Sequence, residues 1–424
     1  MKLHIENIMA IKSVDIDLDG ITVIVGNNNT GKSTAGKVLW TMFRALRDIN
    51  KRTYYERVNG CFRVIRTKSP MMLWDGTRPF RHTCLDYAEQ LVDKKISVDS
   101  FINIIKQEYQ GSKERDLFPP DWDEFKKRLQ EILAIKEDEL QKQVVFTYFK
   151  RGLGEQFFPL FKEHGKPSVK MTIKGKYLEV FFNNSLPEIN LQLDLQNNAY
   201  YFASPSLLEN TNSDRLSNSD NLFIEEKNNI VNSFKQDGVI VEDLLLRKKY
   251  ESIEAQLARI LEGKITYDRD IRDFCLESSK YTTPLSFANL SQGVKSMATL
   301  QAAFSRGAIG EKDVLILDEP EIHLHPEWQV KYADLIVQLQ KAFNLTILLT
   351  SHSPDFVEAI RLCSKKYGLE KKLNGYISEI QPDSGAVTMK KISVDNWDTM
   401  FEKFAKSVDM LMDLRSSIEG EFDE

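Results

Sequence analysis

The chain has 424 residues, of which 42% are hydrophobic and 28% are charged, and its 57 Lys and Arg against 62 Asp and Glu leave a formal net charge of −5. This composition is typical of a soluble globular protein and excludes disorder throughout. No stretch reaches the roughly 18 consecutive apolar residues of a membrane helix, and the charged N-terminus lacks a signal-peptide pattern, so we expect two or three structural units in the cytoplasm and no membrane contact.

The N-terminal residues predict two strands followed by a helix. Residues 14–20 alternate apolar and charged side chains, as in a half-buried strand, and residues 21–25 form a β-branched run typical of a buried strand. From Lys32 onward, apolar residues recur at helical spacing. A strand, a short loop and a helix are therefore expected in succession.

The middle of the chain mixes helical and strand patterns. Residues 46–165 predict a mainly helical insertion, with one helix over residues 123–146, and residues 166–203 predict a series of strands. Residues 209–221 are polar and predict a loop. The helix expected after this loop has a single apolar seam, too short for a long coiled-coil arm, made of Leu246, Tyr250, Ile253, Leu257 and Ile260.

The last third of the chain predicts two buried strands and a mixed tail. Residues 314–317 and 345–349 are apolar runs that end abruptly in polar residues. Strand patterns recur at residues 375–380 and 386–389, and residues 395–415 keep a helical phase before an acidic end. The polar residues that end the two buried strands are candidates for a functional site.

A phosphate-binding pattern lies between the strand over residues 21–25 and the helix that starts at Lys32. It fits G-x-x-x-x-G-K-[ST] and consists of Gly26, Asn27, Asn28, Asn29, Thr30, Gly31, Lys32 and Ser33. The glycines let backbone N–H groups surround a polyphosphate, and the helix N-terminus adds its positive dipole end. Since the Lys32 ammonium reaches the terminal phosphates and the Ser33 hydroxyl can hold Mg²⁺, the motif predicts a nucleotide and Mg²⁺ as ligands.

Two further strand ends carry residues suited to nucleotide hydrolysis. Asp318 and Glu319 follow the buried strand over residues 314–317, at the edge where open α/β sheets bind ligands. Asp318 can hold Mg²⁺ through water, and Glu319 can deprotonate an attacking water. His352 follows the strand over residues 345–349 and can approach a γ-phosphate, although a single histidine there is more often a hydrogen-bonded loop residue.

A fourth element, Ser291-Gln292-Gly293, opens a predicted helix 27 residues before Asp318. Alone it indicates only a helix N-cap. In their order and spacing, however, the four elements resemble those of the ABC-type ATPases. The resemblance implies an α/β fold: a P-loop core of mixed or parallel sheet with flanking helices, and a helical insertion between the Walker A loop and the Ser-x-Gly signature.

The same resemblance implies roles for individual residues. In that family the signature of one subunit closes over the γ-phosphate held by the Walker A loop of another, so hydrolysis needs a homodimer or a higher even-numbered oligomer. By position, Lys32, Glu319 and His352 are expected to be catalytic, and Ser33 and Asp318 to hold Mg²⁺. The expected nucleotide contacts are Gly26, Asn27, Asn28, Asn29, Thr30, Gly31, Lys32, Ser33, Thr34, Ser291, Gly293 and Lys295.

Within the family, the motif sequences are similar to those of the prokaryotic branch that contains the OLD nucleases and the ATPase subunit of Septu anti-phage systems. The motifs concerned are GNNNTGKST, LSQGVKS, LDEPEIHLHPEWQ and TSHSPDF. The resemblance covers residues 1–45 and 195–360, and it includes a D-loop over residues 321–326 that lines the dimer seam. Two departures stand out. The signature has LSQGV in place of LSGGQ, and no glutamine ends the strand expected within residues 199–206, where a Q-loop would begin.

Four segments follow from these patterns. Residues 1–45 form the N-terminal part of the core with Walker A, and residues 46–165 form the insertion. Residues 166–360 carry antiparallel strands, the signature, Walker B and the switch histidine, and residues 361–424 form the C-terminal strands, helix and acidic tail. The insertion is too long for a transporter subunit, and its short helices do not suit an SMC-type arm. Only 72 residues follow His352, too few for the nuclease domain of the OLD proteins.

We therefore expect an ATPase subunit of a prokaryotic anti-phage system that hydrolyses ATP and controls a separate effector, a nuclease. The anti-phage role depends on the family resemblance alone. Two alternatives share every motif. One is an SMC-like DNA-repair ATPase that acts with a nuclease, and the other is a non-catalytic scaffold in which ATP only holds a dimer closed.

A basic and aromatic stretch runs from Arg44 to His82. It contains ten Lys and Arg against three Asp and Glu, with Tyr54, Tyr55 and Trp74 interleaved. Such a stretch suits contact with nucleic acid, because its cations neutralise phosphates and its aromatic rings stack on exposed bases. A solvated helical face with buried aromatic residues, or a docking surface for the effector, explains the same pattern.

Overall fold

The computed structural model of the chain describes residues 1–68, 80–111, 121–154, 156–161, 165–183, 186–192, 194–203, 205–209, 227–228, 230–232, 241–305, 307–393, 396–401 and 412. The chain divides into two compact units. The first, which we call the core unit, comprises Met1–Arg47 and Thr147–Glu424, and the second, the helical unit, comprises Asp48–Phe146.

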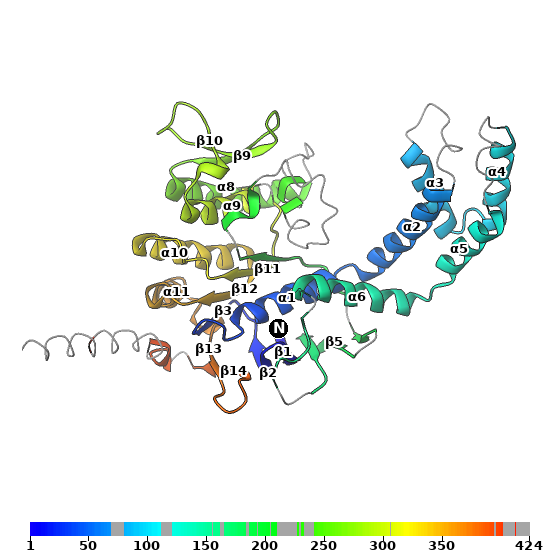
Figure 1. Ribbon diagram of the computed structural model, residues 1–424. Helices are drawn as coiled ribbons and strands as arrows, with labels where there is room; N and C mark the ends of the chain where they lie inside the picture. The colour runs from blue at the N-terminus through cyan, green and yellow to red at the C-terminus, as the bar shows by residue number, and fades with distance from the viewer. Residues whose placement is uncertain are drawn as a thin grey trace, which may run out of the picture. The chain divides into compact units, whose positions relative to one another are not determined.

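The core unit is built on a mixed sheet that has eleven strands within the described residues, in the order β6-β5-β4-β1-β2-β14-β13-β3-β12-β11-β7 (Figure 1). With its flanking helices, this sheet confirms the predicted α/β fold class. The strands are β1 (Lys2–Ile8), β2 (Ile11–Asp17), β3 (Ile21–Gly26), β4 (Ser168–Ile173), β5 (Lys176–Phe181), β6 (Glu188–Leu191), β7 (Ala199–Phe202), β11 (Val314–Asp318), β12 (Thr346–Ser351), β13 (Leu373–Ile380) and β14 (Val387–Ile392).

Five adjacent strands of this sheet, β13, β3, β12, β11 and β7, run parallel. In register, Ser378 lies opposite Gly26, Asp318 opposite Thr350, and Leu317 opposite Phe202. The carboxyl ends of parallel strands lie at one edge of a sheet. The topology therefore brings the Walker A loop, the Walker B carboxylates and the switch-histidine loop to the same edge, although Gly26 and His352 lie near opposite ends of the core sequence.

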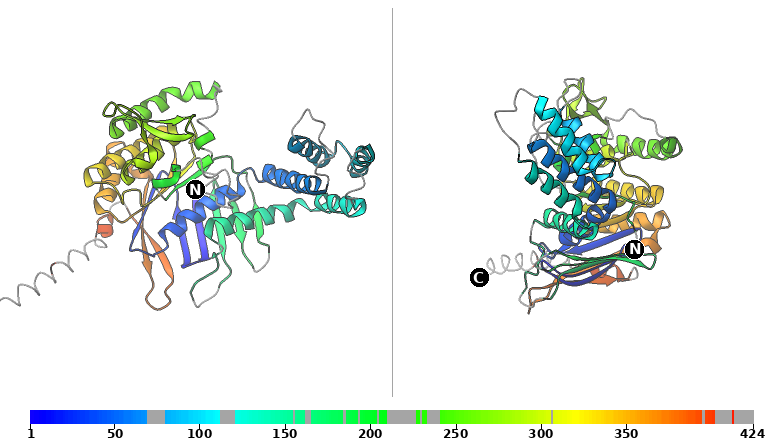
Figure 2. Two further views of the ribbon diagram at one scale, coloured as in Figure 1. Left: turned by 45° about the horizontal axis from the view of Figure 1, so that its top comes forward. Right: turned by 90° about the vertical axis from the view of Figure 1, so that its right-hand side faces the viewer.

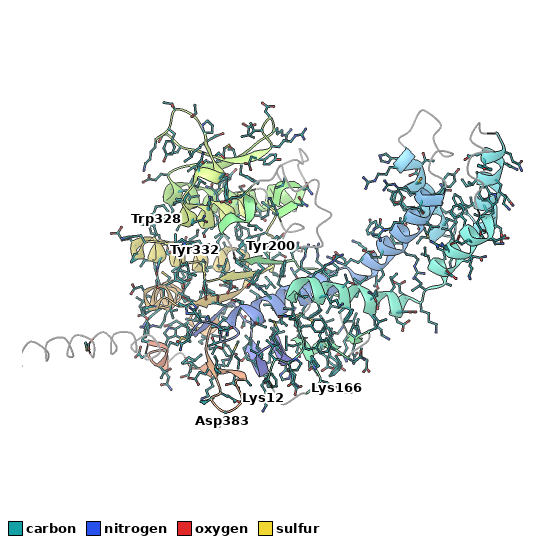
Figure 3. All side chains as sticks on the ribbon, in the orientation of Figure 1. Lys12, Lys166, Tyr200, Trp328, Tyr332 and Asp383 are labelled. Atoms are coloured by element: carbon teal, nitrogen blue, oxygen red, sulfur yellow. The ribbon has the colours of Figure 1, made fainter. Side chains whose placement is uncertain are left out.

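Both faces of the parallel strands are covered, which explains their continuous apolar runs. On one face, Leu315 and Leu317 join a hydrophobic cluster with residues of α10 (Pro326–Phe343) and α11 (Pro354–Lys366). Trp328 and Tyr332 of α10 belong to this layer (Figure 3). On the other face lies α1 (Lys32–Leu46), where a Cβ on Gly36 would stand 3.0 Å from Ile316 Cγ2. Alternate residues of β11 thus face opposite helix layers.

The signature segment lies in a small α/β subassembly of the core unit. Here a second sheet, three-stranded within the described residues, is formed by β8 (Lys264–Asp268), β9 (Asp273–Glu277) and β10 (Leu285–Ser286). It packs with α8 (Val241–Leu261) and α9 (Gln292–Ser305), which themselves pack side by side (Figure 1). Short 3₁₀ turns lie at Pro205–Leu208, Phe287–Asn289 and Glu370–Lys372. The helix α8 contains the predicted seam at Leu246 to Ile260.

The helical unit contains α2 (Ile49–Lys68), α3 (Phe80–Val92), α4 (Val98–Gly111), α5 (Trp122–Ala134) and the first half of α6 (Glu137–Leu153), coloured blue to cyan in Figure 2. Its own hydrophobic cluster joins Val58, Cys61 and Ile65 of α2 with residues of the other helices, among them Phe101, Phe125 and Leu129. A mainly helical insertion is therefore present, as the sequence predicts.

Two details of the insertion differ from the sequence predictions. The single helix expected over residues 123–146 is interrupted after Ala134, where Ile135 leaves the helical conformation and the acidic first turn of α6 begins. The separate unit also ends at Phe146 rather than at residue 165. The second half of α6 belongs to the core unit because its side chains pack there: the Phe149 and Phe182 ring centroids are 4.7 Å apart.

The C-terminal strands β13 and β14 form an antiparallel hairpin, seen in orange in Figure 2. Of the helix predicted over residues 395–415, only residues 396–401 and 412 are described, and most of the polar loop over residues 209–221 lies outside the described residues as well. Among the described helices, none combines the length and the apolar character that crossing a membrane requires.

Candidate ATP-binding and hydrolysis site

The Walker A residues form a tight loop between β3 and α1. Asn29 and Gly31 have left-handed backbone conformations, with φ of 61° and 76°. A Cβ on Gly26 would lie 2.6 Å from the carbonyl oxygen of Ser378, so only glycine fits beside β13. Thr30 Oγ1 closes the loop by donating to the Asn27 carbonyl at 2.8 Å. Left-handed turns of this kind direct backbone N–H groups to one point and form an anion-binding nest.

The Lys32 side chain is 3% exposed and lies inside this loop. Its ammonium donates to the carbonyl oxygens of Gly26 at 3.0 Å and Asn27 at 2.8 Å, and it stands 3.8 Å from Glu319 Oε1. Burial lowers the pKa of the Lys32 ammonium, whereas the carboxylate of Glu319 opposes that shift. The buried cation is thus shared between loop carbonyls and one carboxylate, and it lies where a polyphosphate held by the nest would meet it.

Asp318 connects Walker B to Walker A through hydroxyl groups. Ser33 Oγ donates to Asp318 Oδ1 at 3.0 Å, Thr350 Oγ1 donates to the same oxygen at 2.5 Å, and the Tyr201 hydroxyl donates to Oδ2 at 2.6 Å. Ser33 and Asp318, expected to share a magnesium ion, therefore touch each other in the structure. A hydroxyl and a carboxylate are oxygen ligands of the type that Mg²⁺ prefers.

Glu319 follows Asp318 in a left-handed conformation, with φ of 51°. Its backbone N–H donates to Thr350 Oγ1 at 3.0 Å, which ties the strained turn to β12. Its carboxylate contacts His352 Nε2 as well as facing Lys32. A non-glycine residue held in this region costs about 1–3 kcal/mol and is typical of functional sites. In this backbone conformation the Glu319 carboxylate faces the Lys32 ammonium and the His352 imidazole.

The signature residues take a different position from the Walker residues. Ser291 is exposed and caps α9, with its Oγ accepting from the Val294 N–H at 3.4 Å. Gly293 packs against the D-loop: a Cβ there would lie 2.6 Å from the His323 carbonyl oxygen. The structure thus joins the signature to the D-loop of its own chain and leaves the Ser291 hydroxyl on the surface.

Lys295 stands apart from the other expected nucleotide contacts. Its side chain is 5% exposed, and its ammonium pairs with the Glu209 carboxylate and donates to the Ala288 carbonyl at 2.9 Å. Both partners hold the start of α9 in place. In this structure Lys295 therefore acts on the signature helix, and its ammonium is not presented at the surface beside Ser291.

Three residues of this region were not singled out from the sequence. Tyr201 and Thr350 hold Asp318, and Glu321 accepts hydrogen bonds from the switch-histidine loop. Tyr201 belongs to β7, at the position where a Q-loop was expected, and the tyrosine hydroxyl reaches the Walker B aspartate from there. Thr350 and Glu321 lie within the recognised motifs, but their contacts could not be read from them, because the proximity of all three residues to their partners depends on strand order and register.

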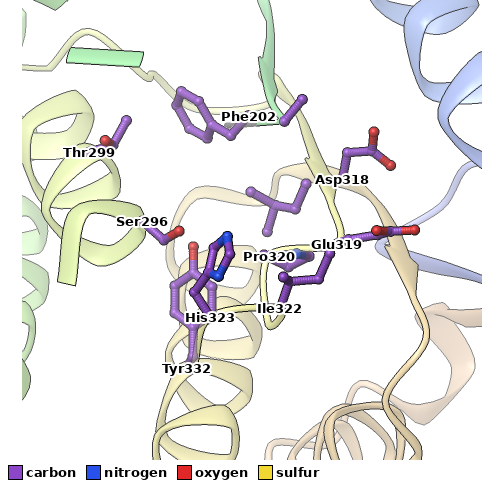
Figure 4. A pocket seen from close by; sticks show the side chains of 11 residues that line it. Phe202, Ser296, Thr299, Asp318, Glu319, Pro320, Ile322, His323 and Tyr332 are labelled. Atoms are coloured by element: carbon purple, nitrogen blue, oxygen red, sulfur yellow. The ribbon is translucent and has the colours of Figure 1, made fainter. Parts of the chain in front are cut away.

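A pocket of about 110 Å³ adjoins the site between α9 and the D-loop (Figure 4). Ser296 and Thr299 line it from the helix side, and His323 and Tyr332 line it from the other. Figure 4 shows the side chains of Asp318 and Glu319 at its border, directed away from the Ser296 side. The D-loop is therefore bordered by free space.

The residues present fit Mg²⁺-ATP. The loop offers converging N–H groups and a buried ammonium to the phosphates, and Ser33 with Asp318 offers oxygen ligands to the metal. Glu319 supplies a carboxylate 3.8 Å from the Lys32 ammonium and in contact with the His352 imidazole. Together these groups are the donor set that nucleotide hydrolysis requires.

Comparison with known proteins shows which family the chain belongs to. Residues 1–357 match the family described as AAA ATPase domain. The probable ATPase of retron Vc95 from Vibrio cholerae serotype O1 biovar El Tor is 24% identical over 159 residues, which are 35% of this chain and 29% of that protein. The probable ATPase of retron Ec83 from Escherichia coli is 33% identical over 92 residues, 19% of this chain and 16% of that protein.

Both matches thus cover less than a third of the curated relatives. Among solved structures, the SMC head domain from Thermotoga maritima aligns with 93% of this chain and 98% of its own, at 10% identity and a TM-score of 0.40. The family match, over residues 1–357, covers far more of the chain than the matches to the two retron ATPases, and it includes Walker A, the signature, Walker B and the switch histidine. The chain belongs to the AAA ATPase domain family.

Proposed function

We propose that the protein is an ABC-type ATPase subunit of a prokaryotic anti-phage system, which binds and hydrolyses ATP, dimerises on ATP and controls a separate nuclease effector. One observation carries the hydrolytic part: the Glu319 carboxylate contacts His352 and stands 3.8 Å from the Lys32 ammonium. Base, cation and imidazole thus meet at one strand edge, although they come from three separate segments of the chain.

Each residue of the site would have a separate role in ATP binding or hydrolysis. Mg²⁺, when bound with ATP, would neutralise developing charge on the phosphates. Lys32 would bind the terminal phosphates through its ammonium, and Ser33 with Asp318 would hold the metal. Glu319 would orient an attacking water and take its proton, and His352 would keep the Glu319 carboxylate in place.

Dimerisation is supported by the surface that the signature and the D-loop expose. Ser291 is exposed at the start of α9, and Ile322 of the D-loop is 56% exposed. A polar cap and an exposed apolar side chain on adjoining segments suit burial against a second copy that presents its Walker A loop. The expected result is an ATP-dependent doubling of mass for the Glu319→Gln chain in light scattering. A monomer at saturating Mg²⁺-ATP would contradict the dimer.

The anti-phage role is supported by the wording of the motifs and by the names of two relatives as retron ATPases. The test is the plating efficiency of phages on cells that carry the gene with its native neighbours. Lys32→Ala should abolish protection, whereas Lys365→Ala, which changes an exposed lysine of α11, should preserve it. No protection by the wild-type locus against a broad phage panel would favour the DNA-repair alternative. Protection without ATP turnover would favour the scaffold.

A second candidate function, contact with nucleic acid, is favoured by one face of α2. The residues exposed at helical spacing on this face are Lys51, Tyr55, Asn59, Arg63 and Arg66, and the Tyr55 side chain is 58% exposed. Arg44 does not take part, since it is buried in α1, and residues 69–79 of the basic stretch, with Trp74, lie outside the described residues. The exposed face combines cations with a ring able to stack on a base.

Binding of single- and double-stranded DNA and RNA across a salt series tests this surface. Changing Arg63 and Arg66 together to Glu should weaken binding and make its salt dependence shallower, because fewer counterions are released. The matched control changes Lys127 and Arg128 of α5, which pair with Glu131 and Glu124 on their own helix. Equal binding by the wild type and the Arg63/Arg66 variant would exclude this face as the contact.

A further inference from the structure

Glu321, the first residue of the D-loop, is directed inward although its neighbours face outward. It is 2% exposed, whereas the following Ile322 is 56% exposed. Its Oε1 accepts from Ser351 Oγ at 2.6 Å and from the His352 N–H at 3.0 Å. Among the described residues, its Oε2 is buried without a hydrogen-bond partner. One carboxylate oxygen thus holds the backbone of the switch-histidine loop.

Burying a carboxyl group costs free energy unless all of its oxygens are hydrogen-bonded. Burial raises the pKa of the Glu321 carboxyl, and the two hydrogen bonds to Oε1 offset only part of that effect. An apolar residue of similar size would avoid the unpartnered oxygen. The hydrogen bonds from Ser351 and His352 are therefore the feature that distinguishes a carboxyl at this position from an apolar side chain.

A second side chain bridges the same two loops independently. Gln329 Nε2 donates to the Leu324 carbonyl of the D-loop at 3.1 Å, and its Oε1 accepts from Ser353 Oγ at 2.6 Å. The D-loop is thus connected by hydrogen bonds to both neighbours of His352 in the sequence. Glu321 bonds to Ser351, and Gln329 bonds to Ser353. Two side chains therefore connect the D-loop to the loop that carries the His352 imidazole.

The D-loop contacts the signature helix on one side and borders a pocket on another. Gly293 of the signature packs on the His323 carbonyl, where even a Cβ would come within 2.6 Å, so a shift of α9 displaces the loop. Pro320, Ile322 and His323 border the pocket of about 110 Å³, which leaves free space beside them. The contacts run from the signature through the D-loop to the switch histidine.

We propose that Glu321 is a positioning residue that couples the D-loop to the contact between His352 and Glu319. This inference rests on the proposed function, in which Glu319 is the base and the D-loop lies at a dimer seam. Glu321 holds the His352 backbone, so the position that the D-loop takes at the seam sets how the imidazole restrains the Glu319 carboxylate. Hydrolysis is thereby linked to assembly of the dimer.

The test compares Glu321→Ala, which removes the acceptor, with Glu321→Gln, whose amide oxygen accepts the same two bonds. A misplacement of about 1 Å in a reacting group costs up to about 10²-fold in rate. We expect Glu321→Ala to lower kcat by about 10- to 10²-fold with KM for ATP within about threefold of wild type. Glu321→Gln should stay within about threefold of the wild-type kcat.

The matched control is Asp313→Asn. Asp313 is also a buried carboxyl next to β11, but it lies at the opposite end of that strand and accepts from the N–H groups of Asn198 and Gly310. Its replacement should lower the melting temperature without changing kcat per folded molecule. A wild-type kcat in Glu321→Ala, or an equal loss in all three variants that follows the fraction unfolded, would overturn the positioning role.

A readout that does not need turnover separates this inference from the proposed function. In NMR spectra of chains labelled at histidine, the His352 ring signal, assigned through His352→Gln, should shift in Glu321→Ala and stay in place in Glu321→Gln. If the wild type hydrolysed no ATP but the shift appeared, the proposed function would fail while the coupling stood. An unchanged His352 signal in Glu321→Ala would overturn the coupling, whatever the ATPase rate.

Discussion

Replacing Glu319 with Gln should separate ATP binding from ATP hydrolysis. The substitution keeps the size of the side chain but removes a charge that contacts His352 and lies 3.8 Å from Lys32 Nζ. Loss of a general base slows hydrolysis by roughly 10²–10⁴-fold. We therefore expect Mg²⁺-ATP to remain bound to a chain that turns over very slowly.

The same geometry predicts the sign of the effect on affinity. At 3.8 Å and an effective dielectric constant of about 20, the attraction between Lys32 and Glu319 is about 4 kcal/mol. Because the Glu319 side chain is 23% exposed, solvent screening reduces this to about 1–2 kcal/mol. Without the carboxylate, the ammonium is free for the phosphates, so the affinity for ATP should rise roughly 5- to 30-fold.

Calorimetry with Mg²⁺-ATP and phosphate-release assays on the same preparations test both parts. Glu327→Gln, which removes an exposed carboxylate from the first turn of α10, is the control and should match the wild type. Hydrolysis by Glu319→Gln within about threefold of the wild-type rate would refute the assignment of the base. Weaker ATP binding than in the wild type would refute the competition for Lys32.

Three other substitutions probe the rest of the structure. Lys295→Ala should destabilise the fold by about 2–4 kcal/mol in denaturant titrations, because it removes the ion pair between the buried Lys295 ammonium and the Glu209 carboxylate, and KM for ATP should change little. A large rise in KM at unchanged stability would instead make Lys295 a nucleotide contact. Mixing Ser291→Arg with Lys32→Ala chains should restore part of the ATPase activity that each lacks alone, and confirmed mixed dimers without activity would exclude shared sites. Phe125→Ala removes a fully buried ring from the helical unit and should lower its stability by about 3–5 kcal/mol, seen as faster proteolysis within residues 48–146; unchanged proteolysis would show that this cluster does not hold the unit together.

Much of the site could be predicted because its main residues follow short apolar strands. The strands ending at Gly26 and Asp318 are continuous β-branched and aliphatic runs, and the polar residues after them belong to recognisable motifs. Parallel strands then place these residues at one edge of the sheet without further information. For this reason the neighbourhood of Lys32, Ser33 and Asp318 follows from local patterns.

The residues that the sequence did not reveal depend on long-range register. Tyr201 reaches Asp318 only because β7 lies beside β11. Thr350 of β12 reaches Asp318 because the two residues are register partners in adjacent strands. The pairing of Lys295 with Glu209 could not be predicted either, because the two residues are 86 positions apart in the sequence. The break at Ile135 escaped prediction because apolar spacing continues across it. Such details are set by tertiary packing rather than by local pattern.

We propose that one Mg²⁺-dependent site for ATP hydrolysis is formed by Lys32, Ser33, Asp318 and Glu319. Its most direct test is steady-state phosphate release by the purified wild-type chain, with and without Mg²⁺, beside Lys32→Ala and Asp318→Asn. We expect phosphate release by the wild type to require Mg²⁺, and we expect no release above background in either variant. Equal release by the three chains, or release by the wild type that persists in EDTA, would contradict it.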